Sequence, residues 1–379
     1  MSSASIFPRT GLAGQLVGQI LHTSPTSAST SGIFLAAPRR TGKSTFVRED
    51  LRPELQRRGA LVIYADLWAD RSTDPSKIMA TAIHAELVKH GNVVAKLARA
   101  IGITGGKVGG VDFSIDRVGV GKDVHLTAAL VALSDEVKIP IVVIIDEAQH
   151  ALTSAEGVDS LFALKAARDE LNSSAHWGLR LVCTGSNRDK LAMLRNSKDQ
   201  AFFGAPLVNF PHLGRDYIDW FCKNVALPAQ LHPDLVWPLF ERAGFRPELL
   251  GAAADALRFD FTLEARDVAR CFTAAVDEQI AAARGEVIRV IHGLTPLQAA
   301  VLRVLSASGI DYRPFEAQTL ERYRETRRQA GQDDGVKIDV PAVQSALLAL
   351  QEKALVWRAA RGVYALEDAA LQEVLRDSP

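Results

Sequence analysis

The sequence has little of what marks secreted, metal-binding or membrane proteins. It holds three cysteines, Cys183, Cys222 and Cys271, among 379 residues. Three widely spaced cysteines suit reduced thiols better than a disulfide framework or a metal site, and the nine histidines show no ligand spacing. No apolar run approaches the length of a membrane span. We therefore expect a cytoplasmic protein without membrane contact.

An excess of charge is also missing. The chain has 44 Lys and Arg against 44 Asp and Glu, so nothing attracts it globally to nucleic acid or to a membrane surface. With 47% hydrophobic residues, its length suggests two or three domains with ample cores. No acidic residue precedes Glu49, as in a transit peptide, but the first motif begins too early to leave room for a removable leader.

The most informative segment is Ala37-Pro-Arg-Arg-Thr-Gly-Lys-Ser44, a phosphate-binding loop pattern in which Ala37 replaces the first glycine. Residues 32–36 predict the strand before it, and residues 45–56 the helix after it. Backbone N–H groups and the helix N-terminus bind phosphates in this geometry. We expect Lys43 to reach the outer phosphates and Ser44 to ligate Mg²⁺. The candidate nucleotide-binding residues of the loop are Ala37, Pro38, Arg39, Arg40, Thr41, Gly42, Lys43, Ser44 and Thr45.

A second motif follows much later in the chain, where the apolar run 139–145 ends in Asp146-Glu147. A run that is apolar on both faces is typical of a central strand in a parallel sheet. Ligands bind at the carboxyl ends of such strands. We expect Asp146 to hold Mg²⁺ and Glu147 to polarise the attacking water. An acidic turn after a core strand is the plainer alternative, but both motifs in this order predict an ATPase.

A third apolar run, residues 179–183, leads into Thr184-Gly-Ser-Asn187. In P-loop ATPases with an added strand between the two motifs, a polar residue here touches the γ-phosphate or the lytic water. Ser186 and Asn187 are therefore candidate catalytic residues, and Thr184 is less favoured. The alternative is an ordinary strand-to-helix turn in which Ser186 or Asn187 caps the helix.

These motifs resemble those of the archaeal-type ATPases, relatives of the origin-recognition AAA+ proteins and of the signal-transducing STAND NTPases. The resemblance runs over about residues 6–260 and more loosely to the end. It implies that residues 242–250 take the place of a Gly-Gly-x-Pro lid motif, with Phe245 instead of the second glycine. Arg246 would then sense the phosphates, and Pro247 would pack near the adenine. The alternative for Arg246 is a solvated arginine at a helix start.

In one respect this sequence departs from the proteins that it resembles. Many relatives carry an arginine finger just before the last core strand, but residues 202–206 contain no arginine. Arg188 and Arg195 lie upstream, and the sequence assigns the role to neither. Since such an arginine contributes a large rate factor, its absence favours slow turnover and a switch.

The expected fold is α/β, a P-loop NTPase of the AAA+ origin-recognition type with a parallel sheet, a helical lid and a C-terminal winged helix. We expect the ATPase core at 1–213, the lid at 214–292 and the winged helix at 293–379. The remaining expectations are an entry helix near the adenine at 7–21, a strand at 60–66, a helix at 76–90 and a Gly-rich hairpin at 102–121. Helical patterns predict lid helices at 215–225, 233–242, 247–259 and 262–283. The winged helix is predicted as helices at 295–307, 314–328 and 340–353, followed by a hairpin of 354–358 and 362–366.

The charges of the last domain do not favour strong DNA binding. Residues 293–379 hold 11 Lys and Arg against 12 Asp and Glu, with Arg322, Arg324, Arg327 and Arg328 on the second helix. Because phosphate neutralisation supplies most non-specific affinity, we expect weak binding of duplex DNA by one copy. Two functions stay open: an ATP-controlled DNA-binding protein, or a STAND-type signalling or defence ATPase whose winged helix mediates protein assembly. Either needs ATP and ADP, and a protein partner or a homo-oligomer is expected.

Overall fold

The computed structural model describes residues 6–22, 28–37, 40–93, 126–173, 176–186, 188–196, 200–331, 337–360, 362–367 and 370–377. Its N-terminal part is a five-stranded sheet in the order β2-β3-β4-β1-β5, and every neighbouring pair is parallel. The strands are β1 (Ile33–Ala36), β2 (Leu61–Asp66), β3 (Ile141–Asp146), β4 (Leu179–Gly185) and β5 (Leu207–Asn209). Since β4 lies between β1 and β3, the predicted added strand between the two motif-bearing strands is confirmed.

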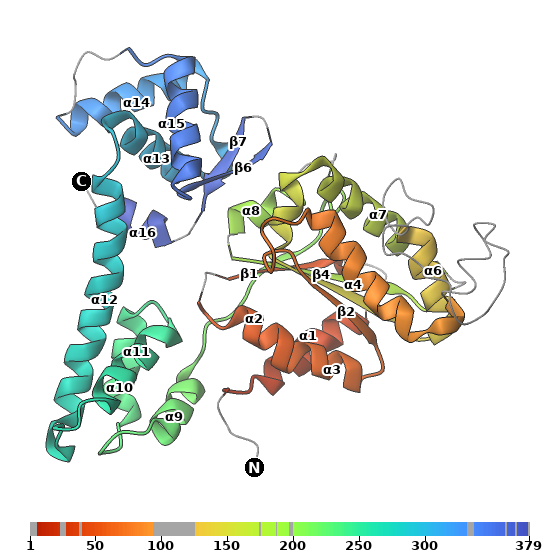
Figure 1. The fold of residues 1–379 in the computed structure, drawn as a ribbon, viewed down its shortest axis with the longest axis horizontal. Helices are drawn as coiled ribbons and strands as arrows, with labels where there is room; N and C mark the ends of the chain where they lie inside the picture. Colours follow the sequence, from red (N-terminus) through yellow and green to blue (C-terminus); the bar gives the residue numbers. More distant parts are fainter. Residues whose placement is uncertain are drawn as a thin grey trace.

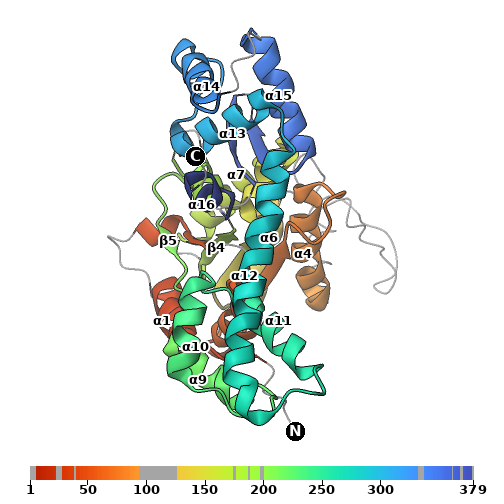
Figure 2. The same ribbon diagram turned by 90° about the vertical axis from the view of Figure 1, so that its left-hand side faces the viewer.

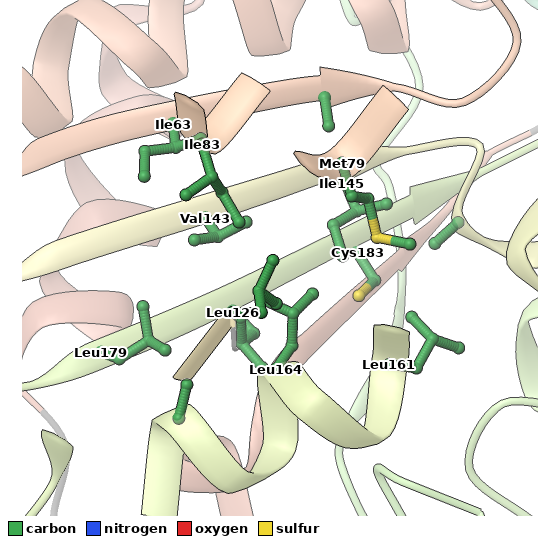
Figure 3. Close-up of a cluster of buried hydrophobic side chains, with 14 of the residues drawn as sticks. Ile63, Met79, Ile83, Leu126, Val143, Ile145, Leu161, Leu164, Leu179 and Cys183 are labelled. Atoms are coloured by element: carbon green, nitrogen blue, oxygen red, sulfur yellow. The ribbon is translucent and has the colours of Figure 1, made fainter. Parts of the chain in front are cut away.

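Helices cover both faces of this sheet (Figure 1), which is why β3 is buried at every position. On one face, Val143, Ile145 and Cys183 pack against α4 (Pro75–Lys89), α6 (Leu126–Val137) and α7 (Ala155–Leu171) (Figure 3). On the other face, Val142, Ile144 and their neighbours pack against α1 (Thr10–Leu21) and the helix that follows the loop. Successive side chains of a strand point to opposite faces of the sheet, so neighbouring residues of β3 belong to two different cores.

The helix after the loop differs from the prediction of a plain helix over 45–56. It begins at Lys43 as α2 (Lys43–Phe46), continues as a π-helical turn η2 (Val47–Leu51) and ends as α3 (Arg52–Arg57). Pro53 explains the wide turn, because it has no N–H to donate and its ring would clash with the preceding turn. The N–H of Arg52 accordingly reaches back five residues to the Val47 carbonyl.

Helices α9 (Arg215–Asn224), α10 (Pro233–Arg242), α11 (Pro247–Arg258) and the first half of α12 (Val268–His292) share one hydrophobic core. The prediction that the last of these helices ends at 283 is wrong. The helix runs through Gly285 to His292, since a glycine costs a helix only about 1 kcal/mol. After Gly285, the residues Val287, Ile288 and Ile291 pack against the core of the C-terminal module. Figure 2 shows α12 as one long rod.

The C-terminal module consists of α13 (Pro296–Ser308), α14 (Ala317–Gln329), α15 (Val340–Glu352), the antiparallel strands β6 (Val356–Ala360) and β7 (Val363–Leu366), and α16 (Ala370–Asp377). Thr295 and Gln298 form a capping box that starts α13. Helix α14 begins later than residue 314, since Pro314 lies before it and its carbonyl accepts a bond from the Tyr323 hydroxyl. Among the described residues, none of the helices could span a bilayer.

Several predicted features lie outside the described residues. They are the Gly-rich segment 102–121, Pro38 and Arg39 of the loop, and Asn187.

Candidate active site

Strand order brings the two motifs together. In a parallel sheet the carboxyl ends of neighbouring strands meet at one edge. The ends of β1, β4 and β3 are adjacent, so the loop after β1 faces Thr184 and Asp146. Gly42, the cap of α2, has a φ of 84°. This backbone conformation favours glycine and lets the chain turn directly into Lys43.

Lys43 is the centre of the site. Its Nζ atom lies 2.6 Å from Asp146 Oδ1, 3.0 Å from Glu147 Oε1 and 3.0 Å from Thr184 Oγ1. The side chain is only 5% exposed. A buried ammonium is stable only with such partners, because removing a charge from water costs several kcal/mol. Lys43, Asp146 and Glu147 thus form one buried cluster, and their roles toward a nucleotide stay predictions.

The cluster keeps both acids ionised. Burial alone would raise the pKa of Asp146, but the Lys43 ammonium and hydrogen bonds from Thr184 and Ser44 hold it at about 2. The pKa of Glu147 is also lowered, since the pull of Lys43 and hydrogen bonds outweigh the opposing effect of burial. At neutral pH the site therefore presents two ionised carboxylates beside the Lys43 side chain.

Further hydrogen bonds, from residues outside the two motifs, hold the Asp146 carboxylate in place. The Tyr64 hydroxyl, from neighbouring β2, donates to Asp146 Oδ2 over 3.1 Å. Burial raises the pKa of Tyr64, so it stays protonated and can donate. Arg48 Nε donates to the Tyr64 oxygen over 3.2 Å, and its guanidinium pairs with Asp66 at 2.8 Å. Neither Tyr64 nor Arg48 was singled out from the sequence, because no motif marks them.

Glu147 is held from its other side. Its Oε2 atom accepts bonds from Gln149 Nε2 (2.6 Å), Ser186 Oγ (2.9 Å) and the Ser186 N–H (3.3 Å). The backbone of Glu147 has a φ of 53°, an uncommon conformation for a non-glycine residue. Ser186, expected to touch phosphate or water, therefore contacts the acid that would act on the water.

Sequence reasoning missed Gln149, which is completely buried. Its side chain fills the space beside Gly185, where an added Cβ would lie 2.4 Å from Gln149 Oε1. Gly185 is thus required for this close approach. The only signal in the sequence was an amide two residues after the acid pair, at the start of the short helix η4 (Ala148–Thr153).

The two residues of the predicted lid, Arg246 and Pro247, are not joined to this cluster by the contacts that the structure describes. Arg246 pairs with Glu248 at 2.7 Å and lies at the residue before α11, without a side-chain capping bond, and Pro247 takes the first position of that helix. Their roles toward a nucleotide stay predictions. Arg188 bonds the side chain of Asn209, and Arg195 bonds Asn196 at 3.2 Å.

The N-terminal segment links the sheet domain to the helices that begin with α9. The Arg9 guanidinium donates to the carbonyls of Pro211 and His212 at 2.9 and 3.1 Å. Phe7 packs edge-on against Tyr217, with ring centroids 5.5 Å apart. The expected position of this segment near the adenine stays a prediction, but it does lie where the core passes into α9.

Comparison with known proteins supports the fold. No protein-family model and no curated protein matches the chain. The chain is similar to the Walker-type ATPase paby2304 of Pyrococcus abyssi, with 17% identity over 96% of this chain and 95% of that one, and a TM-score of 0.54. The Aeropyrum pernix ORC2 protein in ADPNP-ADP complexes matches at 16% identity over 99% and 96% of the two chains, with a TM-score of 0.49. The first likeness, together with the sheet order, establishes a P-loop ATPase fold.

Proposed function

We propose that this protein binds Mg·ATP at residues 37–45 and hydrolyses it slowly. The observation that carries the proposal is the buried cluster of Lys43, Asp146 and Glu147 beside a loop whose Gly42 turns directly into a helix. An ammonium and a helix N-terminus suit the phosphates. The Ser44 hydroxyl and the Asp146 carboxylate are the hard oxygen donors that Mg²⁺ prefers, so they would hold the ion, which would neutralise phosphate charge.

The geometry indicates how the residues divide the work. When phosphates enter, the Lys43 ammonium exchanges its carboxylate partners for phosphate oxygens. Gln149 and Ser186 keep Oε2 of Glu147 in place, so Oε1, which Lys43 has left, can orient and polarise a water molecule. Thr184 remains beside Asp146 to hold that carboxylate.

The slow rate follows from the missing arginine finger. The loop at 202–206 offers no arginine, and Arg188 and Arg195 have asparagine partners. A second protein or a second copy would have to supply the cation that speeds phosphoryl transfer. The nucleotide state would then persist long enough to act as a switch.

We further propose that the C-terminal module is a winged helix that binds duplex DNA when several copies assemble. Three helices followed by a hairpin occur in the order of such modules. Its exposed cations include Arg324, Arg328 and Lys337, whereas Arg327 is buried. The exposed face of α15 carries Gln344, Ser345 and Leu348 but no cation. One copy would bind weakly, and ATP-driven assembly would add avidity.

The test measures ATP hydrolysis and particle mass with and without duplex DNA, for the wild type and for Glu147→Gln. The variant should keep Mg·ATP bound and lose about 100-fold or more of the single-turnover rate, because an amide cannot polarise water as a carboxylate does. Glu156→Gln, at an exposed position of α7, is the matched control. Hydrolysis at the wild-type rate in Glu147→Gln would move the chemistry elsewhere. Assembly with ATP but without any effect of DNA would point to a protein partner instead.

A further inference from the structure

The hairpin of β6 and β7 has buried side chains on both faces, although Arg358 and Val363 near its turn are exposed. One face carries Val356, Tyr364 and Leu366, which belong to the core of the C-terminal module. The other face carries the cross-strand pair Trp357 and Ala365. These two residues are 6% and 4% exposed, yet they are not part of that core. Something outside the module covers them.

The cover comes from the ATPase core. Lys190, on the short helix α8 (Arg188–Ala192), is completely buried. Its ammonium lies 2.8 Å from Glu367 Oε2, 3.3 Å from the Glu367 carbonyl oxygen and 5.1 Å from the centre of the Trp357 ring. Strand β6 also packs against η4. Figure 1 shows the hairpin reaching from its module toward α8. We call Lys190 and η4 the hairpin seat.

Both parts of the hairpin seat are continuous with the segments that hold Glu147. Helix η4 begins directly after Glu147 and contains Gln149. Helix α8 begins two residues after Ser186. Gln149 and Ser186 are the two residues that bond Glu147 Oε2. The C-terminal hairpin therefore rests on the structure that fixes the candidate catalytic carboxylate.

The lid is tied to the same hairpin through α12. Its first half contributes Val268, Phe272 and Val276 to the lid core, and Ile291 near its end belongs to the core of the C-terminal module. A continuous helix of 25 residues is about 37 Å long. Because both ends of α12 are packed into cores, a rotation of the lid would carry the C-terminal module with it. A lid that rotated over the loop would then pull the hairpin from its seat.

We propose that the hairpin is a latch: seated on Lys190 and η4, it holds the lid and the C-terminal module in one position, and ATP binding unseats it. This rests on the ATP-binding function proposed above. Unseating would expose Trp357 and Ala365. The indole N–H of Trp357 is buried without a hydrogen-bond partner among the described residues. A contact with such an unsatisfied donor is less costly to break.

The ion pair makes the latch testable without nucleotide. Glu367→Gln keeps the shape of the side chain but removes the carboxylate that pairs with the buried ammonium. Amide hydrogen exchange in 188–192 and 356–366 should become about tenfold faster or more, since loss of one partner of a buried pair strongly favours the open state. Glu352→Gln, exposed on α15 of the same module, is the matched control. Lys190→Met combined with Glu367→Met should restore part of the protection that either single change removes. Equal exchange in the wild type, Glu367→Gln and Glu352→Gln would overturn the latch.

The link to nucleotide is tested with Mg²⁺ and a non-hydrolysable ATP analogue. In the wild type the analogue should speed exchange in 356–366, and ADP should do so less. Glu367→Gln should bind the analogue about tenfold more tightly, because a latched protein gives up affinity in proportion to its closed fraction. If the wild type binds no analogue, the proposed function fails. The amide hydrogen exchange of Glu367→Gln without nucleotide would still test whether the ion pair holds the hairpin on its seat. If the analogue binds but hairpin exchange is the same in every nucleotide state, the latch alone fails.

Discussion

Lys43 and Lys190 are both buried in the N-terminal sheet domain, and each is paired with a carboxylate, but the partners lie in different parts of the chain. Lys43 has Asp146 and Glu147 on its own domain, at the carboxyl end of β3. Lys190 has Glu367, which lies 177 residues away on the C-terminal hairpin. Both pairs carry a large desolvation cost, so neither is a simple source of stability. Each ion pair instead holds two segments in place. A bound phosphate would have to break the pairs of Lys43, and a movement of the hairpin would have to break the pair of Lys190.

The largest expected effect separates the two lysines by ATP affinity. Lys43→Met removes the ammonium that should meet the phosphates and should weaken ATP binding about 100-fold, as for other charge-assisted contacts of a few kcal/mol. Lys190→Met leaves the loop intact and, by loosening the latch, should tighten binding. Isothermal calorimetry measures both affinities.

Lys43→Met also leaves Asp146 and Glu147 as neighbouring buried acids, so thermal unfolding must show that the variant is folded. Lys223→Met, at an exposed position of α9, controls for loss of a positive charge. Unchanged ATP affinity in folded Lys43→Met would remove the nucleotide site from residues 37–45.

A smaller effect is expected at Gln149, which stands between the two clusters. Gln149→Met keeps the volume but removes the donor to Glu147 Oε2. The rate of hydrolysis should fall about tenfold with little change in KM, because a positioning residue acts on the transition state more than on substrate binding.

Gln149→Glu should shift the pH dependence of hydrolysis, which a purely structural role of Gln149 would not do. A second carboxyl beside Glu147 disfavours its ionised form and raises its pKa. Activity on the acidic side should then be lost at a higher pH than in the wild type. Rates measured across pH for both variants check this, and a wild-type pH profile in Gln149→Glu would argue against the contact.

The difference between the lysines also explains how far the sequence could be read. Lys43 lies in a motif whose spacing encodes one strand-loop-helix unit, and the apolar run 139–145 placed β3 within two residues of Ile141–Asp146. Both depend on neighbours in the chain and on sheet order. The pairing of Lys190 with Glu367 depends on how two modules dock, and no periodicity records that. Gln149 was missed for a related reason, since its role depends on Gly185 from another strand.

The helix that joins the modules was misjudged on local grounds. The helical pattern was predicted to end at residue 283, before Gly285, but α12 continues because Ile291, with Val287 and Ile288, packs on the next core. Packing at both ends overrides the weak helix propensity of one glycine. Gly285 is therefore the place to test whether α12 transmits the lid's motion.

The smallest expected effect comes from Gly285→Ala. A Cβ at this position would have no atom within 4 Å, and the residue is already helical. Alanine should therefore stabilise the protein by about 0.5–1 kcal/mol, which thermal unfolding can detect. A stiffer α12 should keep or enlarge the effect of nucleotide on hairpin exchange.

Gly285→Pro should have the opposite effect on α12, since proline in a helix interior costs about 3 kcal/mol and kinks the helix. That variant should bind ATP more tightly than the wild type does, because its lid no longer has to unseat the hairpin, and hairpin exchange should no longer respond to nucleotide. If hairpin exchange in Gly285→Pro still follows the nucleotide, the coupling passes from Glu147 through Gln149 and η4 directly, and the two buried lysines communicate within the ATPase core without the lid.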